Sequence, residues 1–131
     1  MEPGKKTKIL IIDDDSFLLD MYAVKFSQAG YEVTTGLGPE PALAHLRGHL
    51  EPNIILLDIA MPGMDGFELL ETLKKENLVP FAIKIILSNR GQEADVARGI
   101  ALGASGYIVK ANSTPSEVLA KVADIVSKLP H

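Results

Sequence analysis

The chain has 131 residues, of which 47% are hydrophobic and 23% charged, and its net charge is −4 at pH 7. These values are typical of one globular domain, and the acidic balance argues against direct nucleic-acid binding, which needs a concentrated basic face. The absence of cysteine excludes disulfides, thiolate zinc sites and a cysteine nucleophile. No apolar run approaches the roughly 18 residues that span a bilayer, and the first residues lack the apolar core of a signal peptide. We therefore expect a cytoplasmic protein with no membrane partner.

The first half of the chain predicts two strand–helix units. Four consecutive apolar residues predict a buried strand over residues 8–13, and acidic residues follow it. Residues 17–28 have helical spacing, and Asp15 or Ser16 is a suitable cap. One stripe of this helix contains Phe17, Met21, Val24 and Gln28. Residues 31–35 alternate as a strand does, and Gly38-Pro39 starts a second helix whose apolar residues are Ala42, Leu43 and Leu46.

The second half continues the same alternation. A continuous apolar run predicts a strand over residues 53–58 that is buried on both faces and ends in Asp58. Helices are expected from residue 65, over residues 92–102 and from residue 114, where Thr114 to Glu117 form a capping box. The interior Gly99 weakens the second of these helices, and the last one has five inward residues: Val118, Val122, Ile125, Val126 and Leu129. Strands are expected over residues 83–87 and 107–109.

Five strands that alternate with five helices predict an α/β fold. Such alternation implies a parallel sheet with right-handed crossovers and helices on both faces. Eight units would be needed for a closed barrel, so we expect an open, doubly wound, flavodoxin-like sheet with strand order 2-1-3-4-5. We expect a single domain over residues 1–131, with its core at about residues 8–129.

Polar residues follow four of the five predicted strands. Asp13 and Asp14 follow the first strand, Asp58 the third, Ser88 the fourth and Lys110 the fifth. In a parallel sheet these ends share one edge, where ligands bind. Clustered carboxylates repel one another unless a cation lies among them, and an oxygen-rich site open to water suits Mg²⁺.

These residue types suit phosphoryl transfer. A metal and a lysine neutralise a transferring phosphoryl group, and a carboxylate such as Asp58 can accept it as a nucleophile. Simpler roles exist for each residue alone, since Asp15 suits a helix cap, Ser88 a turn and Lys110 a solvated position. Chance is a poor explanation for acid, hydroxyl and amine groups at the same edge.

From about Lys8 to Leu129 the chain resembles the receiver domains of two-component response regulators. The matching segments are Ile11 to Asp15, Leu57 to Gly66, Ile86 to Ser88 and Tyr107 to Lys110. The resemblance implies that Asp58 is the phosphoacceptor for a histidine kinase or a phosphotransfer protein. It also implies further site residues: Asp13, Asp14, Asp58 and the backbone carbonyl of Ala60 as ligands of Mg²⁺ (or Mn²⁺), Ser88 and Lys110 as phosphoryl ligands, and Tyr107 as a switch that turns inward when Ser88 moves.

Several positions depart from the usual pattern of that family. Ala111 follows Lys110 where the family usually has proline, often after a cis bond. A cis bond before a non-proline residue costs about 2.5–4 kcal/mol, so the sequence leaves the conformation of this turn open. Asn89 replaces a small alanine. Ala60 and Arg90 occupy two positions that tune the phosphoryl lifetime, and Arg90 is long enough to reach over the site.

The resemblance implies a signalling module rather than an enzyme with turnover on other substrates. The first helix is expected to meet the kinase or phosphotransfer domain. The face of the fourth helix, fifth strand and last helix is expected to contact an output partner, or a second copy in a homodimer. We expect no output domain within the 131 residues.

Two other functions stay open at the level of the sequence. A phosphatase or phosphotransferase of the haloacid-dehalogenase type would also use Asp58, but it needs a second aspartate where Ala60 stands. A receiver fold used constitutively for protein contact would not need the complete acidic, hydroxyl and lysine set. Nucleotide binding through a P-loop is not supported, because the chain has no Gly-rich loop that ends in Gly-Lys-Ser/Thr.

Overall fold

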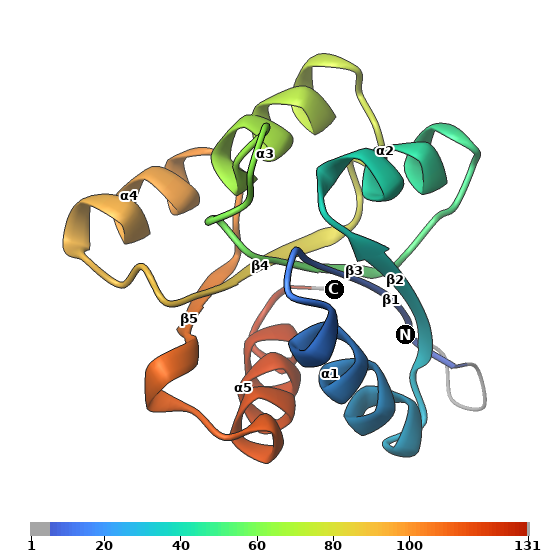
Figure 1. The fold of residues 1–131 in the computed structure, drawn as a ribbon, viewed down its shortest axis with the longest axis vertical. Coiled ribbons are helices and arrows are strands. Elements are labelled where there is room, and N and C mark those ends of the chain that lie inside the picture. The colour runs from blue at the N-terminus through green and yellow to red at the C-terminus, as the bar shows by residue number, and fades with distance from the viewer. Residues whose placement is uncertain (1–5, 131) are drawn as a thin grey trace.

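The computed structural model describes residues 6–130 of the chain, which form five parallel strands alternating with five α-helices (Figure 1). The strand order is β2-β1-β3-β4-β5, which confirms the predicted doubly wound sheet. The elements in chain order are β1 (Lys8–Asp13), α1 (Ser16–Gln28), β2 (Glu32–Leu37), α2 (Pro39–Arg47), β3 (Ile54–Leu57), α3 (Gly66–Lys75), β4 (Ile83–Ser88), α4 (Glu93–Ala101), β5 (Gly106–Val109), the 3₁₀-helix η1 (Lys110–Asn112) and α5 (Pro115–Ser127).

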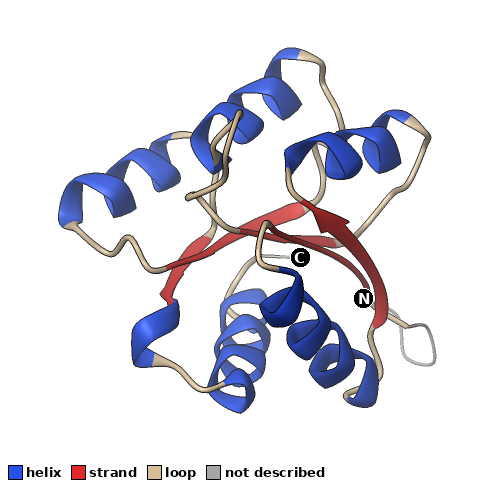
Figure 2. Ribbon diagram, in the orientation of Figure 1, coloured by secondary structure: helices blue, strands red, loops and turns tan. Residues whose placement is uncertain are grey.

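Two layers of helices cover the sheet. Helices α2, α3 and α4 lie on one face, and α1 and α5 lie on the other (Figure 2). The central strands β1 and β3 are buried on both faces, because alternate residues of each strand enter separate hydrophobic cores. One core holds Leu10, Ile12, Ile55 and Leu57 with residues of α2 and α3. The other holds Ile9, Ile11, Ile54 and Leu56 with residues of α1 and α5.

Side-chain caps fix the starts of three helices. Asp15 is the N-cap of α1, and its carboxylate accepts the Leu18 N–H at 3.1 Å. Reciprocal capping boxes start α3 at Asp65 and α5 at Thr114. The capping functions predicted for Asp15 and Thr114 are confirmed. Each cap satisfies backbone N–H groups that have no partner within the helix.

Helix α1 buries a different face from the stripe expected from the sequence. The buried residues are Leu19, Tyr22 and Phe26. Phe17 and Val24 of the expected stripe are 76% and 55% exposed. The prediction that this stripe forms the buried face of α1 is therefore wrong. Apolar residues occur on both sides of the helix, and periodicity alone does not show which side is buried.

The interior glycine of α4 is a point of close packing. A Cβ atom at Gly99 would lie 2.5 Å from Ile86 Cδ1 and 3.5 Å from the Tyr107 ring. Glycine therefore lets α4 approach β4 and β5 closely, at a cost in helix propensity. This close contact explains why α4 contains Gly99, a residue that the sequence alone indicates only as one that weakens the helix.

The structure shows the backbone conformation of the turn after β5. Lys110 to Asn112 form η1, and the Lys110–Ala111 bond is trans, since the described residues contain no cis peptide bond. Lys110 begins this turn directly after Val109, at the end of the sheet where Ser88 also lies. No helix within residues 6–130 has the length and apolar character needed to cross a membrane.

Candidate functional site

The strand register places the predicted site residues at one edge of the sheet. Ile12 pairs with Leu57, so Asp13 and Asp58 follow at the same level of neighbouring strands. Ser88 is the last residue of β4 and pairs with Val109, directly before Lys110. Four residues far apart in sequence therefore share the carboxyl edge of the sheet, as the sequence predicted.

Lys110 joins the two buried carboxylates. Its Nζ donates to Asp13 Oδ2 at 2.6 Å and to Asp58 Oδ2 at 2.7 Å. The three side chains are only 8%, 3% and 7% exposed, respectively. Because hydrogen bonds between charged groups shielded from water are strong and directional, this contact fixes the position of both carboxylates.

The second oxygen of each buried carboxylate is held by the backbone. Asp13 Oδ1 accepts the Asp15 N–H at 3.0 Å, and Asp58 Oδ1 accepts the Ala60 N–H at 3.1 Å. Each carboxylate is therefore bound on both sides, by the lysine and by an amide two residues further on. This arrangement restricts rotation of the acid groups and pre-organises the site.

Burial and charge act in opposite directions on the ionisation of the site. Burial raises the pKa of Asp13 above its ordinary value and outweighs the hydrogen bond from Lys110, which lowers it. Burial also lowers the pKa of Lys110, but its hydrogen bonds and attraction to both aspartates together outweigh burial and raise that pKa. Lys110 therefore stays charged, while burial makes the ionised form of Asp13 less favourable in the folded protein.

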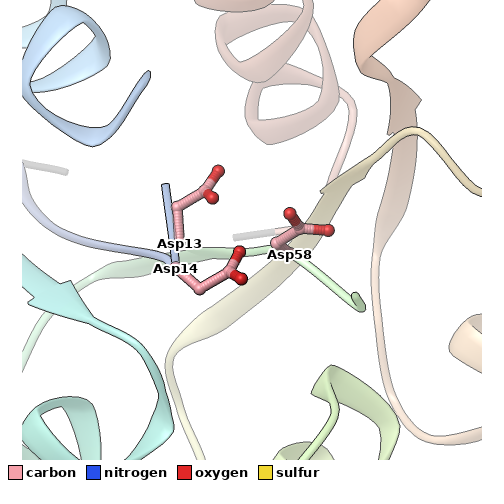
Figure 3. A group of neighbouring side chains, drawn as sticks. All are labelled: Asp13, Asp14 and Asp58. Atoms are coloured by element: carbon pink, nitrogen blue, oxygen red, sulfur yellow. The ribbon is translucent and has the colours of Figure 1, made fainter. Parts of the chain in front are cut away.

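Asp14 completes a candidate metal site. Asp13, Asp14 and Asp58 each offer a carboxylate oxygen, and these oxygens lie within 4.8 Å of one another. The three side chains come from the ends of β1 and β3, and the Asp14 carboxylate points toward Asp58 (Figure 3). Lys110 supplies one positive charge against three negative ones, so a divalent cation fits both the charge and the hard oxygen donors.

Ser88 and Tyr107 are joined through the backbone of Arg90. Ser88 is fully buried, and its Oγ accepts the Arg90 N–H at 3.3 Å. The Tyr107 hydroxyl donates to the Arg90 carbonyl oxygen. A movement of Ser88 would therefore disturb the residue that Tyr107 binds. This gives a physical connection between the two residues predicted to form a switch.

The Arg90 side chain is directed to α3 and α4. Its guanidinium donates to Asp95 Oδ1 at 3.0 Å and lies 5.7 Å from the centroid of the Phe67 ring. Arg98 lies over the same ring at 4.4 Å. This stack could not be predicted from the sequence, because it joins residues of three separate segments through their side-chain rotamers.

Tyr22 is a second neighbour that sequence reasoning missed. It is 3% exposed on α1, and the charges of Lys110, Asp13 and Asp58 all act on its hydroxyl, whose pKa is raised mainly by burial. The spacing of Leu19, Tyr22 and Phe26 is the helical signal that could have identified it. Tyr22 is therefore a buried neighbour of the site whose hydroxyl feels the charges of the acidic residues and of Lys110.

Fold and site together define a doubly wound α/β domain with an acidic and lysine-bearing edge. The family model described as the response regulator receiver domain matches residues 9–123. The chain therefore belongs to the response regulator receiver domain family, the signalling domains of two-component systems. The family resemblance stated from the sequence is confirmed.

Individual relatives agree with this assignment. The chain is 37% identical over 129 residues to a probable transcriptional regulator, ycf27, of Cyanophora paradoxa, covering 98% of this chain and 51% of the relative. It is 31% identical over 124 residues to the response regulator SaeR of Staphylococcus aureus, covering 94% of this chain and 52% of the relative. The chain thus spans about half the length of these curated relatives.

Solved structures show the same fold. The chemotaxis protein CheY4 of Vibrio cholerae superposes with a TM-score of 0.84 at 27% identity, covering 92% of this chain and 99% of that one. A CheY-like receiver domain protein of Methanospirillum hungatei has a TM-score of 0.83 at 30% identity, covering 95% and 96%. Both neighbours match nearly the whole chain.

Proposed function

We propose that Asp58 accepts a phosphoryl group from a phosphohistidine of a histidine kinase or phosphotransfer protein. The observation that carries the proposal is the contact of Lys110 Nζ with both Asp58 and Asp13 at 2.7 and 2.6 Å. A fixed ammonium beside a buried carboxylate suits a site where negative charge arrives and must be neutralised. The receiver domain would act as a signalling switch in a phosphorelay. The product of the transfer would be the domain itself, phosphorylated on Asp58.

The transfer is a displacement at phosphorus. One Asp58 oxygen forms a bond to phosphorus while the bond from phosphorus to the histidine nitrogen breaks, and the electron pair of that bond remains on the imidazole. The product is an acyl phosphate on Asp58. Lys110 stays charged throughout and is close enough to move from a carboxylate oxygen to a phosphoryl oxygen. Ser88 would donate its hydroxyl hydrogen to a second phosphoryl oxygen.

Asp13, Asp14, Asp58 and the backbone carbonyl of Ala60 would hold Mg²⁺, and Mn²⁺ satisfies the same donors. The grouping of the three carboxylates within 4.8 Å supports this. The bound ion supplies charge neutralisation for phosphoryl oxygens. The exposed position of Asp14 leaves one side of the group open to water, as a Mg²⁺ ion that keeps several waters requires.

Phosphorylation would bias a two-state element through Ser88, Arg90 and Tyr107. The hydrogen bonds from the Arg90 backbone support this connection. The face of α4, β5 and α5 would then present a different surface to an output partner or a second copy. The first helix, with its exposed Phe17, would receive the kinase or phosphotransfer domain. We further propose that residues 1–131 act as one receiver domain in the cytoplasm.

Phosphorylation by a small donor tests the proposal. The chain is incubated with Mg²⁺ and acetyl phosphate, and its intact mass is measured. One added phosphoryl group is expected for the wild type and none for Asp58→Asn, which keeps the shape of the side chain. Asp65→Asn is the matched control and should be phosphorylated normally, because Asp65 caps α3. An unmodified wild type in every condition would instead favour constitutive protein contact, and continued turnover of phosphomonoesters would favour a hydrolase.

A further inference from the structure

Lys84 is a charged residue in a strand that is otherwise apolar up to Ser88. It is the second residue of β4, and the other residues before Ser88 are all isoleucine or leucine. Because side chains alternate along a strand, Lys84 lies on the same face as Ile86, which belongs to the core that also holds residues of α3. Lys84 is half-buried, and a cation in that setting is unfavourable unless a partner compensates its charge.

The ammonium group of Lys84 has one acceptor among the described residues. Its Nζ donates to the Val79 carbonyl oxygen at 3.2 Å, and that oxygen also accepts the Ala82 N–H at 3.0 Å. None of the ion pairs in the described part of the chain includes Lys84. Burial lowers the pKa of Lys84, and no charged neighbour offsets that effect. The protein therefore leaves the charge of Lys84 without a counter-ion.

The ends of the neighbouring helices do not replace that counter-ion. Carbonyl groups at a helix C-terminus attract cations, but here they bind backbone N–H groups that follow the helix. The Leu73 carbonyl of α3 accepts the Leu78 N–H at 2.8 Å, and the Gly99 carbonyl of α4 accepts the Ala104 N–H at 3.0 Å. The ammonium group of Lys84 donates to neither carbonyl.

A small groove opens beside Lys84, between α3 and α4, which lie on the same face of the sheet (Figure 1). Its volume is about 270 Å³. Four leucines contribute to its apolar walls: Leu70, Leu73, Leu78 and Leu102. Among the described residues that line it, the charged ones are both lysines, Lys74 and Lys84. The groove thus combines apolar walls with positive charge, although the chain has a net charge of −4.

These features define the chemistry of a ligand. A carboxylate would supply the counter-ion that Lys84 lacks, and an apolar body would cover the leucines. The volume is slightly below the roughly 300 Å³ at which ligand pockets usually begin, so the groove suits one ring or one short chain rather than a peptide helix. We propose that the groove between α3 and α4 binds a small apolar monocarboxylate whose carboxylate group pairs with Lys84.

This site is separate from the phosphoacceptor site. None of the residues that line the groove belongs to the acidic group of Asp13, Asp14 and Asp58. Binding of a carboxylate therefore requires neither a divalent metal nor phosphorylation of Asp58. The proposed function and the carboxylate site can each fail without the other.

Titration of the isotope-labelled chain, followed by amide NMR, tests the proposal. The probes are sodium hexanoate and sodium phenylacetate, added without metal or phosphodonor. Each should produce saturable shifts at Leu70, Leu102 and Gly103, with a dissociation constant of about 1 mM or lower. Hexanamide and phenylacetamide keep the apolar body and lack the charge, so they should bind at least about tenfold more weakly. Acetate keeps the charge and lacks the body, so it should also bind at least about tenfold more weakly.

Two variants locate the charge that is responsible. Lys84→Met removes the ammonium group and keeps the length of the side chain, so it should weaken binding of both carboxylates by at least about tenfold. Lys75→Met is the matched control, because Lys75 is an exposed lysine of α3 that does not line the groove. It removes the same unit of charge and should bind both carboxylates as the wild type does.

The comparison of carboxylate with amide uses only the wild-type chain, so it decides the question even if Lys84→Met fails to fold. Equal binding of the carboxylates and their amides would overturn the proposal. Unchanged binding in Lys84→Met, or an equal loss in Lys75→Met, would contradict the pairing with Lys84. The absence of saturable shifts with both carboxylates, or shifts confined to residues outside the groove, would show that the groove is not the site.

Discussion

The Lys110 ammonium and the Asp58 carboxylate are 2.7 Å apart, although 52 positions separate them in the chain. Both side chains are less than a tenth exposed. The contact exists because β3 and β5 deliver their ends to one edge of the sheet, and the long lysine side chain crosses the end of β4 between them. The same lysine holds Asp13, so one cation supports two buried negative charges.

Removal of the lysine should destabilise the unphosphorylated domain. In Lys110→Ala, Asp13 and Asp58 lose their common partner and face each other unneutralised. Breaking a buried ion pair costs about 3–5 kcal/mol, and we expect a value near the lower end because water reaches this sheet edge. Urea unfolding without divalent metal measures the change.

Lys128→Ala is the matched control for that experiment. Lys128 pairs with Asp124 at 3.0 Å one turn apart on the surface, and its side chain is 73% exposed. Removal of such a pair costs about 0.3–0.5 kcal/mol. Equal losses in the two variants would show that Lys110 has no special structural function.

Mg²⁺ should stabilise the folded chain through Asp14. A ligand at ten times its dissociation constant adds about 1.4 kcal/mol, which raises the melting temperature by about 5 °C in a domain of this size. Asp14→Asn should lose most of this gain and keep its fold, because Asp14 is exposed. Differential scanning calorimetry with Mg²⁺ and with EDTA measures the effect.

A surface aspartate controls for general charge effects. Asp20 is an exposed residue of α1 outside the acidic group, so Asp20→Asn should respond to Mg²⁺ as the wild type does. An equal loss of the response in both variants would indicate non-specific screening and would count against the metal site.

Ionisation of Asp13 should reduce stability as pH rises. Burial raises its pKa in the folded state above the ordinary value of 3.8, so the folded state binds the proton more tightly than the unfolded state does. The resulting stabilisation is fully present below pH 3.8 and is lost as pH rises through the folded pKa. Without metal, Asp13→Asn should therefore be more stable than the wild type at pH 7, and the difference should shrink on acidification.

Glu117 should show the opposite sign. Hydrogen bonds from Thr114 lower its pKa below the ordinary value of 4.5, so its contribution is present above pH 4.5 and is lost as pH falls through the folded pKa. Glu117→Gln keeps an acceptor oxygen and removes the charge. Its loss of stability relative to the wild type should shrink toward acidic pH. Chemical denaturation across pH 3–8 measures both variants, and a common pH profile for the two would contradict both assignments.

Gly99→Ala should destabilise the protein, contrary to the usual effect of this change within a helix. Alanine favours the helix by about 1 kcal/mol, but its Cβ would lie 2.5 Å from Ile86 Cδ1 in the core. Overpacking costs about 1–3 kcal/mol, so we expect a net loss of about 1 kcal/mol in thermal or urea unfolding.

The double variant Gly99→Ala with Ile86→Val tests the cause. Valine lacks the Cδ1 atom that clashes, so the second change should restore part of the loss rather than add to it. The coupling energy in a double-mutant cycle should then favour the pair. Additive losses would show that Gly99 is required for another reason.

The sequence was sufficient for the sheet order and for the residues at its edge. Uninterrupted apolar runs before Asp13, Asp58 and Ser88 identify strands, and parallel strands must bring their ends together. The buried face of α1 was not predictable, because Phe17 and Val24 compete with Leu19, Tyr22 and Phe26 for the core. Only the packing of the whole domain selects between them.

The contacts of the Arg90 side chain could not be predicted from the sequence for a related reason. Its side chain has enough length to reach the acidic edge, and also to reach Asp95 and Phe67. The choice depends on the conformation of the loop after β4 and on the distance between α3 and α4. Both depend on the packing of the whole domain, and no local pattern of residue types indicates them.

Tyr107→Phe should separate phosphorylation from its structural consequence. The change removes the hydroxyl that donates to the Arg90 carbonyl but leaves Asp58, Lys110 and the aromatic ring in place. Phosphorylation by acetyl phosphate should therefore reach the wild-type extent. The change in amide chemical shifts of α4 on phosphorylation should fall to less than half, because the connection from Ser88 ends at Arg90.

Tyr31→Phe is the control for the loss of a tyrosine hydroxyl. Tyr31 packs edge-on against Phe26 on the other side of the sheet, with ring centroids 5.1 Å apart, so its variant should respond to phosphorylation as the wild type does. If Tyr107→Phe gives the full response of α4, the Tyr107 hydroxyl does not transmit the signal, and Ser88 must act on α4 through the Arg90 backbone alone. If it prevents phosphorylation, Tyr107 supports the acceptor site itself rather than the step that follows.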